Sequence, residues 1–558
     1  MKKSLIALLT LAVIGTVAYS QRLDIMLALI KYQASTEVFA EARDVPWQQG
    51  PAEAATEADK RPPNIILIVA DDLGYNDIST FGGGITRVDG SSVQTLGIDR
   101  IAAQGVVFNQ SYSGASSCAP SRAMLMTGRY PTRTGFEFTP TPDGMGSMVT
   151  SIYNSMDNNL PPAIYDAAKE EGQPPYELKG LSPSEITLAE VLQTQGYYTA
   201  HIGKWHLGND QGMGPHDQGF DDSLLMTNGL YLPEDDPNVV NAKIPFDPID
   251  QFLWARLGFS NSFNSGSADQ FKPARYMTDY WTDESVKVIK ANKNRPFFLY
   301  LAHWGPHTPL QATKEDYEAV GDIQPHRKRV YAAMVRAVDR SVERILATLE
   351  AEGLADNTIV AFTSDNGGAG YVGLPETNSP YRGWKITMFE GGLRVPMFIQ
   401  WPNKIPAGKT VDTPVAHIDV MPTLAAAAGA ATPETVEIDG RDILPLVEGE
   451  NNWPRKTLFW QSGHYQVVRH GDWKLQVNNR PTDGLQQWLF NLKDDPTEQN
   501  NLATSHPDKV SELSGLLKIH QQNSRGPLYS ATGQVPVMVD KTLAEAFEAG
   551  DEYIYTPN

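Results

Sequence analysis

The sequence predicts an α/β fold, in which helices flank a large, mostly parallel β-sheet and a smaller C-terminal domain holds an antiparallel sheet. Three observations predict it. Short apolar, β-branched runs recur along the chain, an amphipathic helical segment separates two of them, and short strands with turn signals take over from about residue 453. Ligands bind beyond the carboxyl ends of parallel strands, so the residues after each run are the first candidates for a site.

Each predicted strand ends at charged, amide or histidine side chains. Asn64–Ala70 is a continuous apolar run, which suits a strand buried on both faces, and it stops at Asp71 and Asp72. Three further runs cover residues 197–202, 297–302 and 358–363. They are followed, in that order, by Lys204 and His206, by His303 and His307, and by Asp365 and Asn366. One pocket above the sheet could gather all of these side chains.

A long amphipathic helix is predicted between the third and fourth runs. Apolar residues at spacings of three and four, from Met334 through Val338 and Val342 to Leu349, would form one buried face. Gly353 is the expected stop, because glycine readily adopts the left-handed conformation that ends many helices.

The segment 209–280 departs from this pattern and is expected to be rich in loops. Four side chains in this segment or directly after it could form platforms for a sugar, although packing is the expected role of each: Tyr231, Trp254, Arg275 and Trp281. The whole chain is expected to comprise a signal peptide or N-terminal anchor at 1–20, a linker at 21–60, a main domain at 61–452 and the C-terminal domain at 453–558.

The N-terminus has the features of an export signal. Two lysines precede an apolar run from Leu5 to Ala18, and Ala18 and Ser20 stand where a signal peptidase requires small residues. The run is short for a membrane span, which needs about 20 apolar residues. An uncleaved anchor, with residues 22–32 at a membrane surface, is the alternative. We therefore expect an exported protein, either periplasmic or secreted.

The charge of the chain excludes some partners. Its 46 basic and 66 acidic residues give a formal net charge of −20, which disfavours general binding to nucleic acid or to an anionic membrane. An anionic small substrate stays compatible with this balance, because one local basic pocket can exist beneath an acidic exterior. Membrane contact is expected only through the N-terminal anchor.

Cys118 is the only cysteine among 558 residues, so it has no partner for a disulfide within the chain. Ser116 or Ser117 could cap a helix beginning here, and Pro120 suits its first turn. Free N–H groups and the helix dipole favour anions at such an end, and Arg122 lies one turn further on. The chemical interpretation is a nucleophile beside an anion site; the structural alternative is a small buried hydrophobe.

The run Cys118-Ala-Pro-Ser-Arg122 resembles the Cys-x-Pro-Ser-Arg signature of the type I, formylglycine-dependent sulfatases of the alkaline phosphatase superfamily. Further family motifs follow in family order across about residues 61–500. They are MLMTGRYPTRTG from 124, GKWHLG from 203, a histidine before a Pro-Leu step at His307, and Lys-x-Thr-x-x-Glu-Gly-Gly from Lys385. The arylsulfatase and N-acetylgalactosamine-4-sulfatase branch looks most similar. The resemblance implies an alkaline-phosphatase-like sulfatase fold, with 61–452 as the catalytic domain.

Four of the strand-end side chains would make an all-oxygen cluster: Asp71, Asp72, Asp365 and Asn366. Oxygen ligands suit Ca²⁺ or Mg²⁺ better than zinc, although the first two taken alone equally fit solvated carboxylates. The resemblance implies one divalent cation, expected to be Ca²⁺ with Mg²⁺ as the alternative, held by these four residues and residue 118. Related phosphatases have an Asp-His pair where this chain has Asp365 and Asn366, and they bind two metals. Asn366 therefore favours the sulfatase branch.

The resemblance also implies the chemistry. A maturation enzyme would convert Cys118 to formylglycine, whose hydrated aldehyde attacks the sulfur of a sulfate monoester. The positive groups of Arg122, Lys204 and Lys385 would offset the charge and, with His307, bind the substrate. His307, with Lys385, would protonate the leaving alcohol, and His206 would take the proton that releases sulfate. His303 is expected to be structural.

The predicted function is therefore hydrolysis of sulfate esters on carbohydrates or aryl alcohols. One alternative is a hydrolase of the same fold that acts on phosphodiesters or phosphonate monoesters. A second is an exported scaffold without catalysis, in which the cation only stabilises the fold.

Overall fold

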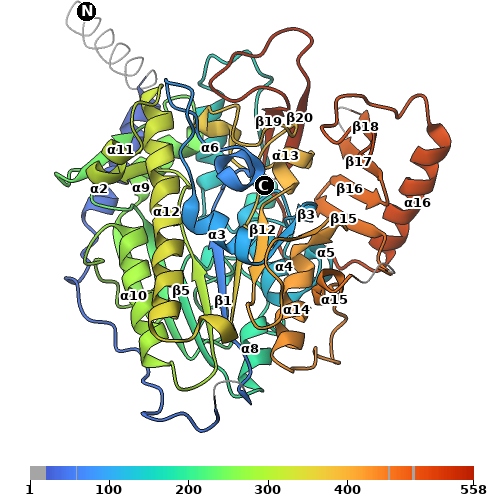
Figure 1. Cartoon of the computed structure of the whole chain (residues 1–558). Helices are drawn as coiled ribbons and strands as arrows, with labels where there is room; N and C mark the ends of the chain where they lie inside the picture. Colours follow the sequence, from blue (N-terminus) through green and yellow to red (C-terminus); the bar gives the residue numbers. More distant parts are fainter. Residues whose placement is uncertain (1–20, 58–59, 450–452, 481–483, 558) are drawn as a thin grey trace, which may run out of the picture.

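The computed structural model describes residues 21–557, apart from 58–59, 450–452 and 481–483 (Figure 1). Within them, a nine-stranded sheet of order β13-β2-β12-β11-β1-β9-β5-β6-β8 forms the centre. The strands from β11 to β6 are parallel, whereas β12 and β8 run antiparallel beside them. The bounds are β1 Asn64–Ala70, β2 Val106–Phe108, β5 Tyr198–Gly203, β6 Asp222–Gly229, β8 Phe259–Phe263, β9 Phe297–Ala302, β11 Thr358–Ser364, β12 Met397–Gln400 and β13 Lys409–Val411. This confirms the predicted fold class.

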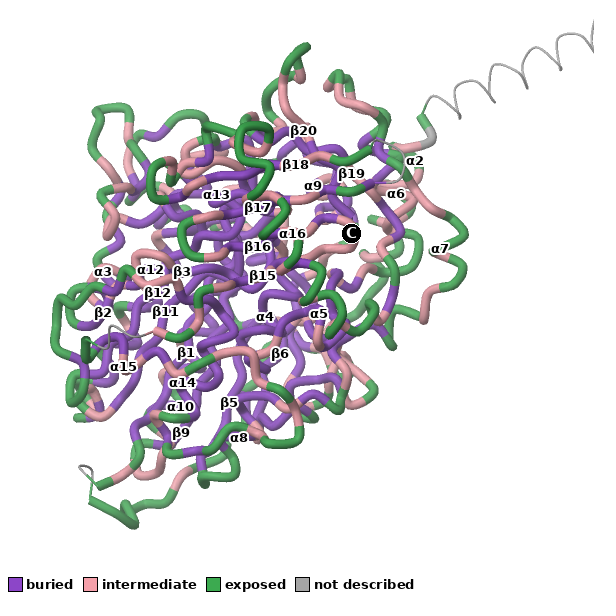
Figure 2. Tube along the Cα trace, turned by 90° about the vertical axis from the view of Figure 1, so that its right-hand side faces the viewer, coloured by how far each residue is buried: buried purple, intermediate pink, exposed green. Residues whose placement is uncertain are grey.

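Strand β1 lies in the middle of the sheet because both of its faces are apolar. Ile66 and Ile68 pack into the core on one side, and Ile65 and Leu67 pack into the core on the other. Each such buried side chain contributes about 1.5–3 kcal/mol relative to an exposed one. Figure 2 shows the buried residues concentrated along these central strands.

Helices cover both faces of the sheet. One face carries α3 (Leu96–Gln104), α10 (Met277–Ala291) and α12 (His326–Ala351), and the other carries α4 (Cys118–Thr127), α8 (Leu188–Gln193) and α14 (Val420–Ala427). Helix α12 is the predicted amphipathic helix. Its Met334, Val338 and Val342 are buried, and Gly353 follows its end with φ +68°.

The segment 209–280 differs from the expected loops. Strands β6 and β8 cross it, but their sequences, DSLLMTNG and FSNSF, are too polar to stand out as apolar runs. Tyr231, Trp254 and Trp281 are buried, so packing accounts for them, while Arg275 is more than half exposed and pairs with Asp283. The segment also contains β7 (Val239–Ala242) and α9 (Pro248–Arg256).

The predicted signal segment 1–20 lies outside the described residues. The segment 21–60, expected to be a linker, contains helix α2 (Arg22–Ser35), which packs against α9. Trp47 then anchors the following stretch, because its indole is buried and donates to Glu284 at 2.7 Å. Among the described helices, none combines the length and the apolarity needed to cross a bilayer.

The C-terminal part forms its own antiparallel sheet, seen beside the main body in Figure 1. It comprises β15 (Thr457–Ser462), β16 (Tyr465–His470), β17 (Trp473–Arg480) and β18 (Gly484–Asn491), covered by α16 (Pro507–Gln522). The chain then returns to the main body, which differs from the expected division at 452. There β19 (Gly533–Met538) pairs with both β20 (Tyr553–Pro557) and β4 (Ile164–Tyr165).

Candidate active site

Four neighbouring parallel strands end at the same edge of the main sheet, and the predicted side chains follow them there. Asp71 and Asp72 follow β1, Lys204 and His206 follow β5, His307 lies in the loop after β9, and Asp365 and Asn366 follow β11. Helix α4 adds Cys118 and Arg122, and an irregular segment adds Lys385. Except for half-buried His206, these side chains are buried.

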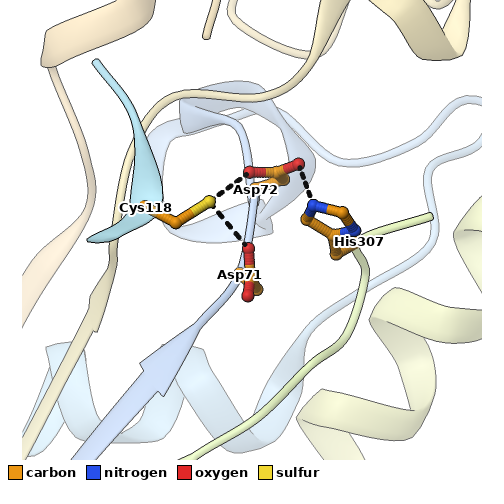
Figure 3. A group of neighbouring side chains, drawn as sticks. All are labelled: Asp71, Asp72, Cys118 and His307. Carbon is orange, nitrogen blue, oxygen red and sulfur yellow. Dashed lines mark hydrogen bonds and ion pairs between the residues drawn. The ribbon is translucent and has the colours of Figure 1, made fainter. Parts of the chain in front are cut away.

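Cys118 is the first residue of α4 and faces the two aspartates (Figure 3). Its Sγ lies 3.5 Å from Oδ1 of Asp71 and 3.8 Å from Oδ1 of Asp72. The expected serine cap is absent: Ser117 occupies the N-cap position, but its side chain makes no capping hydrogen bond. Burial raises the pKa of the Cys118 thiol well above its usual range, despite the opposing charges of Lys204 and Lys385. An unmodified thiol here is therefore a poor nucleophile.

Arg122 lies one turn along α4 and is completely buried among hydrogen-bond acceptors. Its Nε donates to Asp365 Oδ2 at 2.9 Å and its Nη2 donates to Asp71 Oδ2 at 3.1 Å. Its Nη1 donates to the backbone carbonyl of Lys204 at 3.1 Å. Charge-assisted hydrogen bonds of this kind fix orientation as well as charge. Arg122 therefore joins three of the chain segments that form the site.

Two lysines flank the aspartates. Lys204 Nζ lies 2.5 Å from Asp71 Oδ2, and Lys385 Nζ lies 2.8 Å from Asp72 and 2.9 Å from the hydroxyl of Tyr371. Burial alone would raise the pKa of Asp72, but Lys385, His307 and Lys204 together hold that pKa well below its usual range. Burial likewise opposes the charge of Lys385, yet Asp72 raises its pKa well above the usual value. The pair is therefore ionised at neutral pH.

Asn366 presents a buried oxygen without a partner. Its Nδ2 donates to Asp72 Oδ1 at 2.8 Å and to the carbonyl of Gly367 at 2.9 Å, both of which are acceptors, so the amide orientation is settled. Its Oδ1 has no hydrogen-bond partner among the described residues. A buried polar atom left unpaired is costly, and a hard cation would satisfy it.

A cluster of potential ligand atoms lies beside Asn366, whose amide contacts Asp72, and it suits a divalent cation. Asp71, Asp72, Cys118 and His307 each place one potential ligand atom within 4.8 Å of the others. Burial raises the pKa of Asp365 and nearby Asp71 adds to this rise, while Arg122 opposes both. Several carboxyl groups crowded together in a buried site repel one another, and a bound cation would relieve that repulsion.

His307 directs one ring nitrogen into the site. Its Nδ1 lies 2.6 Å from the carbonyl of Thr308, and its Nε2 lies 3.6 Å from Asp72 Oδ2 (Figure 3). The ring stacks on Trp304 with centroids 3.9 Å apart, and the ammonium of Lys204 lies 4.5 Å from the centroid of the same indole. Burial lowers the pKa of His307 to about 3, although Asp72 opposes the shift.

His206 stands at the rim of the site on a strained turn. Its φ is +65° and that of Asp72 is +61°, in the left-handed region that costs a residue with a side chain about 1–3 kcal/mol. Burial lowers the pKa of His206 well below its usual value, and the charges of Lys204 and Arg122 lower it further. Its Nδ1 is buried without a partner among the described residues. Gly203 is required at the start of the turn, since a Cβ there would lie 2.0 Å from a backbone oxygen.

Some neighbours of the site were absent from the sequence-based predictions. Tyr371 donates to Asp72 Oδ2 at 2.7 Å and accepts from Lys385, and Trp304 supports His307. Neither belongs to a periodic pattern, and only the position of Trp304 within the HWGPH string gave a signal. His303 points elsewhere, since its Nε2 lies 2.9 Å from Ser341 on α12, which agrees with its expected structural role.

Comparison with known proteins gives two family matches. Residues 63–430 match the family described as Sulfatase. Residues 382–523 match the family described as N-sulphoglucosamine sulphohydrolase, C-terminal. The first match covers the main sheet and the second covers the C-terminal sheet with the segment that carries Lys385.

Individual proteins are also similar. The chain is 33% identical over 500 residues to N-acetylgalactosamine-6-sulfatase of Homo sapiens, covering 83% of this chain and 86% of that protein. It is 32% identical over 461 residues to steryl-sulfatase of Homo sapiens, covering 72% of each. Among solved structures, Ps i-CgsB in complex with k-i-k-neocarrahexaose is 30% identical with a TM-score of 0.67, covering 84% of this chain and 95% of that one.

Proposed function

Because the chain belongs to the sulfatase family and is a sulfatase enzyme, we propose that it removes sulfate from O-sulfated carbohydrates, using a nucleophile derived from Cys118 and one divalent cation. One observation carries the proposal: Cys118 lies at a helix N-terminus, beside two aspartates that are themselves paired with buried lysines. Such a pocket suits an anion that must be attacked by an oxygen.

The proposed ligands of the cation are Asp71, Asp72, Asp365 and Asn366 together with residue 118. The clustering of Asp71, Asp72 and Cys118 supports this proposal, although His307, and not Asp365, is the fourth member of that cluster. When bound, the cation would offset negative charge at the sulfate and favour ionisation of the attacking hydroxyl. Ca²⁺ is the proposed ion because carboxylate and amide oxygens are its usual ligands, and Mg²⁺ is the alternative. The unpaired Oδ1 of Asn366 supports this assignment on its own.

The Cys-x-Pro-Ser-Arg run that begins at Cys118, and the absence of a second cysteine in the chain, support a modified residue at this position. We propose that a maturation enzyme converts Cys118 to formylglycine, whose hydrate supplies one hydroxyl to attack sulfur and a second to release it. Plain cysteine or serine would lack the second hydroxyl.

The remaining roles follow from where the side chains point. Lys204 and Lys385 bind the sulfate oxygens, and Arg122 supplies positive charge while holding Asp71 and Asp365 in place. The bound sulfate ester adds a negative charge beside His307, which would raise the pKa of His307 from its low value in the empty site. Nε2, with the ammonium of Lys385 nearby, would then carry the proton that goes to the departing alcohol. His206 receives the proton that leaves residue 118 when sulfate is released. General acid and base steps of this kind contribute about 10²- to 10⁴-fold in rate.

The proposed substrate class is a sulfated glycan. One relative is named for N-acetylgalactosamine 6-sulfate chemistry, and one similar structure holds k-i-k-neocarrahexaose. We further propose that the protein is exported, on the strength of the apolar N-terminal run.

The test is release of sulfate from a panel of sulfated glycans, 4-nitrophenyl sulfate and a steryl sulfate, with and without chelator. Matched phosphate monoesters and diesters form the second arm. The proposal expects chelator-sensitive sulfate release that is fastest on a glycan. Faster release from phosphodiesters would favour the alternative hydrolase, and no turnover by chain shown to carry formylglycine would favour the scaffold.

A further inference from the structure

Lys385 is held differently from the other charged residues of the site. It lies in the irregular segment 373–389, between a short helical turn and helix α13 (Glu390–Leu393). The next residue, Ile386, has φ +69°, which is strained for a β-branched side chain. Such a conformation persists only where surrounding structure determines it. The segment therefore needs support from outside itself.

Part of that support comes from the C-terminal sheet. The N–H of Met388 donates to the hydroxyl of Tyr465 on β16 at 3.3 Å. The N–H of Glu390 donates to Oε2 of Glu498 at 2.5 Å. Both hydrogen bonds fix backbone atoms within five residues of Lys385, and both partners come from more than 70 residues further along the chain.

A buried ion cluster reinforces these hydrogen bonds. Lys474 on β17 lies 3.0 Å from Oε1 of Glu390 and 2.9 Å from Oε1 of Glu498, and all three side chains are completely buried. Glu390 also accepts from the hydroxyl of Tyr112 at 2.8 Å. Breaking a buried ion pair by removing one partner leaves an uncompensated charge, so this cluster strongly resists displacement.

The other side of the segment is held by the returning C-terminal chain. The indole of Trp384 donates to the carbonyl of Met538 on β19 at 3.0 Å. Arg382 forms a bidentate pair with Asp540 at 2.6 and 2.7 Å. Lys385 thus lies between two sets of contacts made mainly by residues that follow the main sheet in the chain. These add to the hydrogen bonds from the backbone N–H of Lys385 to Gly368 and from that of Ile386 to Ser116.

We propose that Lys474 and Glu498 are positioning residues that hold the backbone around Lys385, so that its ammonium reaches Asp72 and the sulfate of the substrate. The ion pairs and hydrogen bonds of the Lys474 ammonium run to Glu390 and Glu498, neither of which is among the predicted site residues. The inference rests on the proposed role of Lys385 and adds the part of the chain that makes that role possible.

The experiment is a double-mutant cycle between Lys474→Met and Lys385→Ala, measured as kcat/KM for 4-nitrophenyl sulfate with the matured full chain. In the wild-type background, Lys474→Met should lower kcat/KM about 10- to 100-fold, because displacement of a positioned group by about 1 Å has effects of that size. In the Lys385→Ala background, the same substitution should change kcat/KM less than about twofold, since the group being positioned is gone.

Two further variants complete the design. Tyr465→Phe removes the acceptor for the N–H of Met388 and the hydroxyl that donates to Gln476, whose amide in turn donates to Glu498. It should act in the same direction with a smaller loss, about 3- to 10-fold, so it carries the test if Lys474→Met does not fold. Lys509→Met is the matched control, since Lys509 on α16 pairs with Glu512 at the surface of the same sheet domain. It should leave kcat/KM within about twofold. Circular dichroism at the assay temperature verifies that each variant is folded.

The outcomes separate the two proposals. If Lys385→Ala lowers activity but Lys474→Met and Tyr465→Phe cost the same factor in both backgrounds, the residues are merely structural and the positioning inference is overturned. If Lys385→Ala leaves activity unchanged, the proposed role of Lys385 fails first, and the inference that rests on it fails with it.

Discussion

Asp72 and Lys385 are joined by an ion pair of 2.8 Å, yet different parts of the molecule hold them. Asp72 follows β1, which pairs with β11 along its whole length and is buried on both faces. Lys385 comes from an irregular segment whose backbone is tied to Tyr465 and, through Glu390, to Glu498. The carboxylates are therefore positioned by the main sheet, whereas the lysine depends on the C-terminal sheet as well.

Substitutions in the two parts of the molecule should therefore have different kinds of effect. A change among the strand-end residues should remove a chemical group and leave its neighbours in place, because the parallel sheet sets the backbone. A change in the C-terminal sheet should alter the reaction without touching the substrate. Substitutions in the site itself test the first half of this comparison.

The largest effect is expected from Cys118→Ser, which removes the proposed precursor with little change in volume at the first residue of α4. We expect kcat/KM on 4-nitrophenyl sulfate to fall at least about 10⁴-fold, a loss typical of a missing nucleophile. The melting temperature should stay within about 2 °C of wild type. Peptide mass spectrometry of the wild type should identify formylglycine at 118. Active material with only unmodified cysteine there would contradict the prediction.

His206→Ala and His307→Ala should each lower turnover about 10²- to 10⁴-fold, but on different substrates. Loss of His307 should harm sugar sulfates more than activated aryl sulfates, because an acidic phenol leaves without a proton. Loss of His206 should leave sulfate bound to residue 118, visible by intact mass after turnover. Equal losses on every substrate, with no trapped sulfate in either variant, would refute this division of labour.

Asn366→Ala tests the cation separately from activity. Removing the unpaired Oδ1 should weaken Ca²⁺ binding at least about 10-fold, measured by titration calorimetry and by the rise in melting temperature with added Ca²⁺. The exposed Asn500→Ala is the control and should bind like wild type. Unchanged affinity in Asn366→Ala, or two bound zinc ions in the wild type, would reject the proposed site.

The smallest effect is expected at Trp304, which contacts both His307 and Lys204. Trp304→Leu should lower kcat/KM about 3- to 10-fold, because stacking and cation–π contacts are worth about 0.5–1.5 kcal/mol. Trp304→Phe keeps a ring and should lose less than about threefold. Equal losses in the two variants would show that volume, and not the aromatic face, supports the histidine.

The strands that could be predicted from the sequence are those whose position depends on a local pattern of apolar residues. The apolar runs at 64–70, 297–302 and 358–363 correspond to β1, β9 and β11 within one residue, because buried parallel strands need continuous apolar side chains. Once those strands are adjacent, the residues after them must converge. That is why Asp71 and Asp365 could be placed from the sequence.

Other features depend on contacts that no local pattern records. Strands β6 and β8 lie toward one edge of the sheet and are polar, so the segment 209–280 was expected to be loops. Tyr371 acquires its role only when the irregular segment folds back onto Asp72. The segment 21–60, expected to be a linker, is held against the main body by the buried Trp47. The composition around Trp47 is typical of a linker and gives no sign of this contact. Lys385 was predicted from a motif, but the residues that hold its backbone, Tyr465, Lys474 and Glu498, were not predicted.

The proposed dependence of Lys385 on Glu498 also has a consequence for the order of events during synthesis. Residue 498 is synthesised 380 residues after residue 118, about 20–80 s later at 5–20 residues per second. In the finished protein, the backbone N–H of Ile386 donates to the carbonyl of Ser116, two residues before Cys118. Until Glu498 has been synthesised, the segment that contains Ile386 lacks its hydrogen bond to that residue. The maturation enzyme proposed above, which must reach a side chain that is buried in the finished protein, would therefore have this interval in which to act.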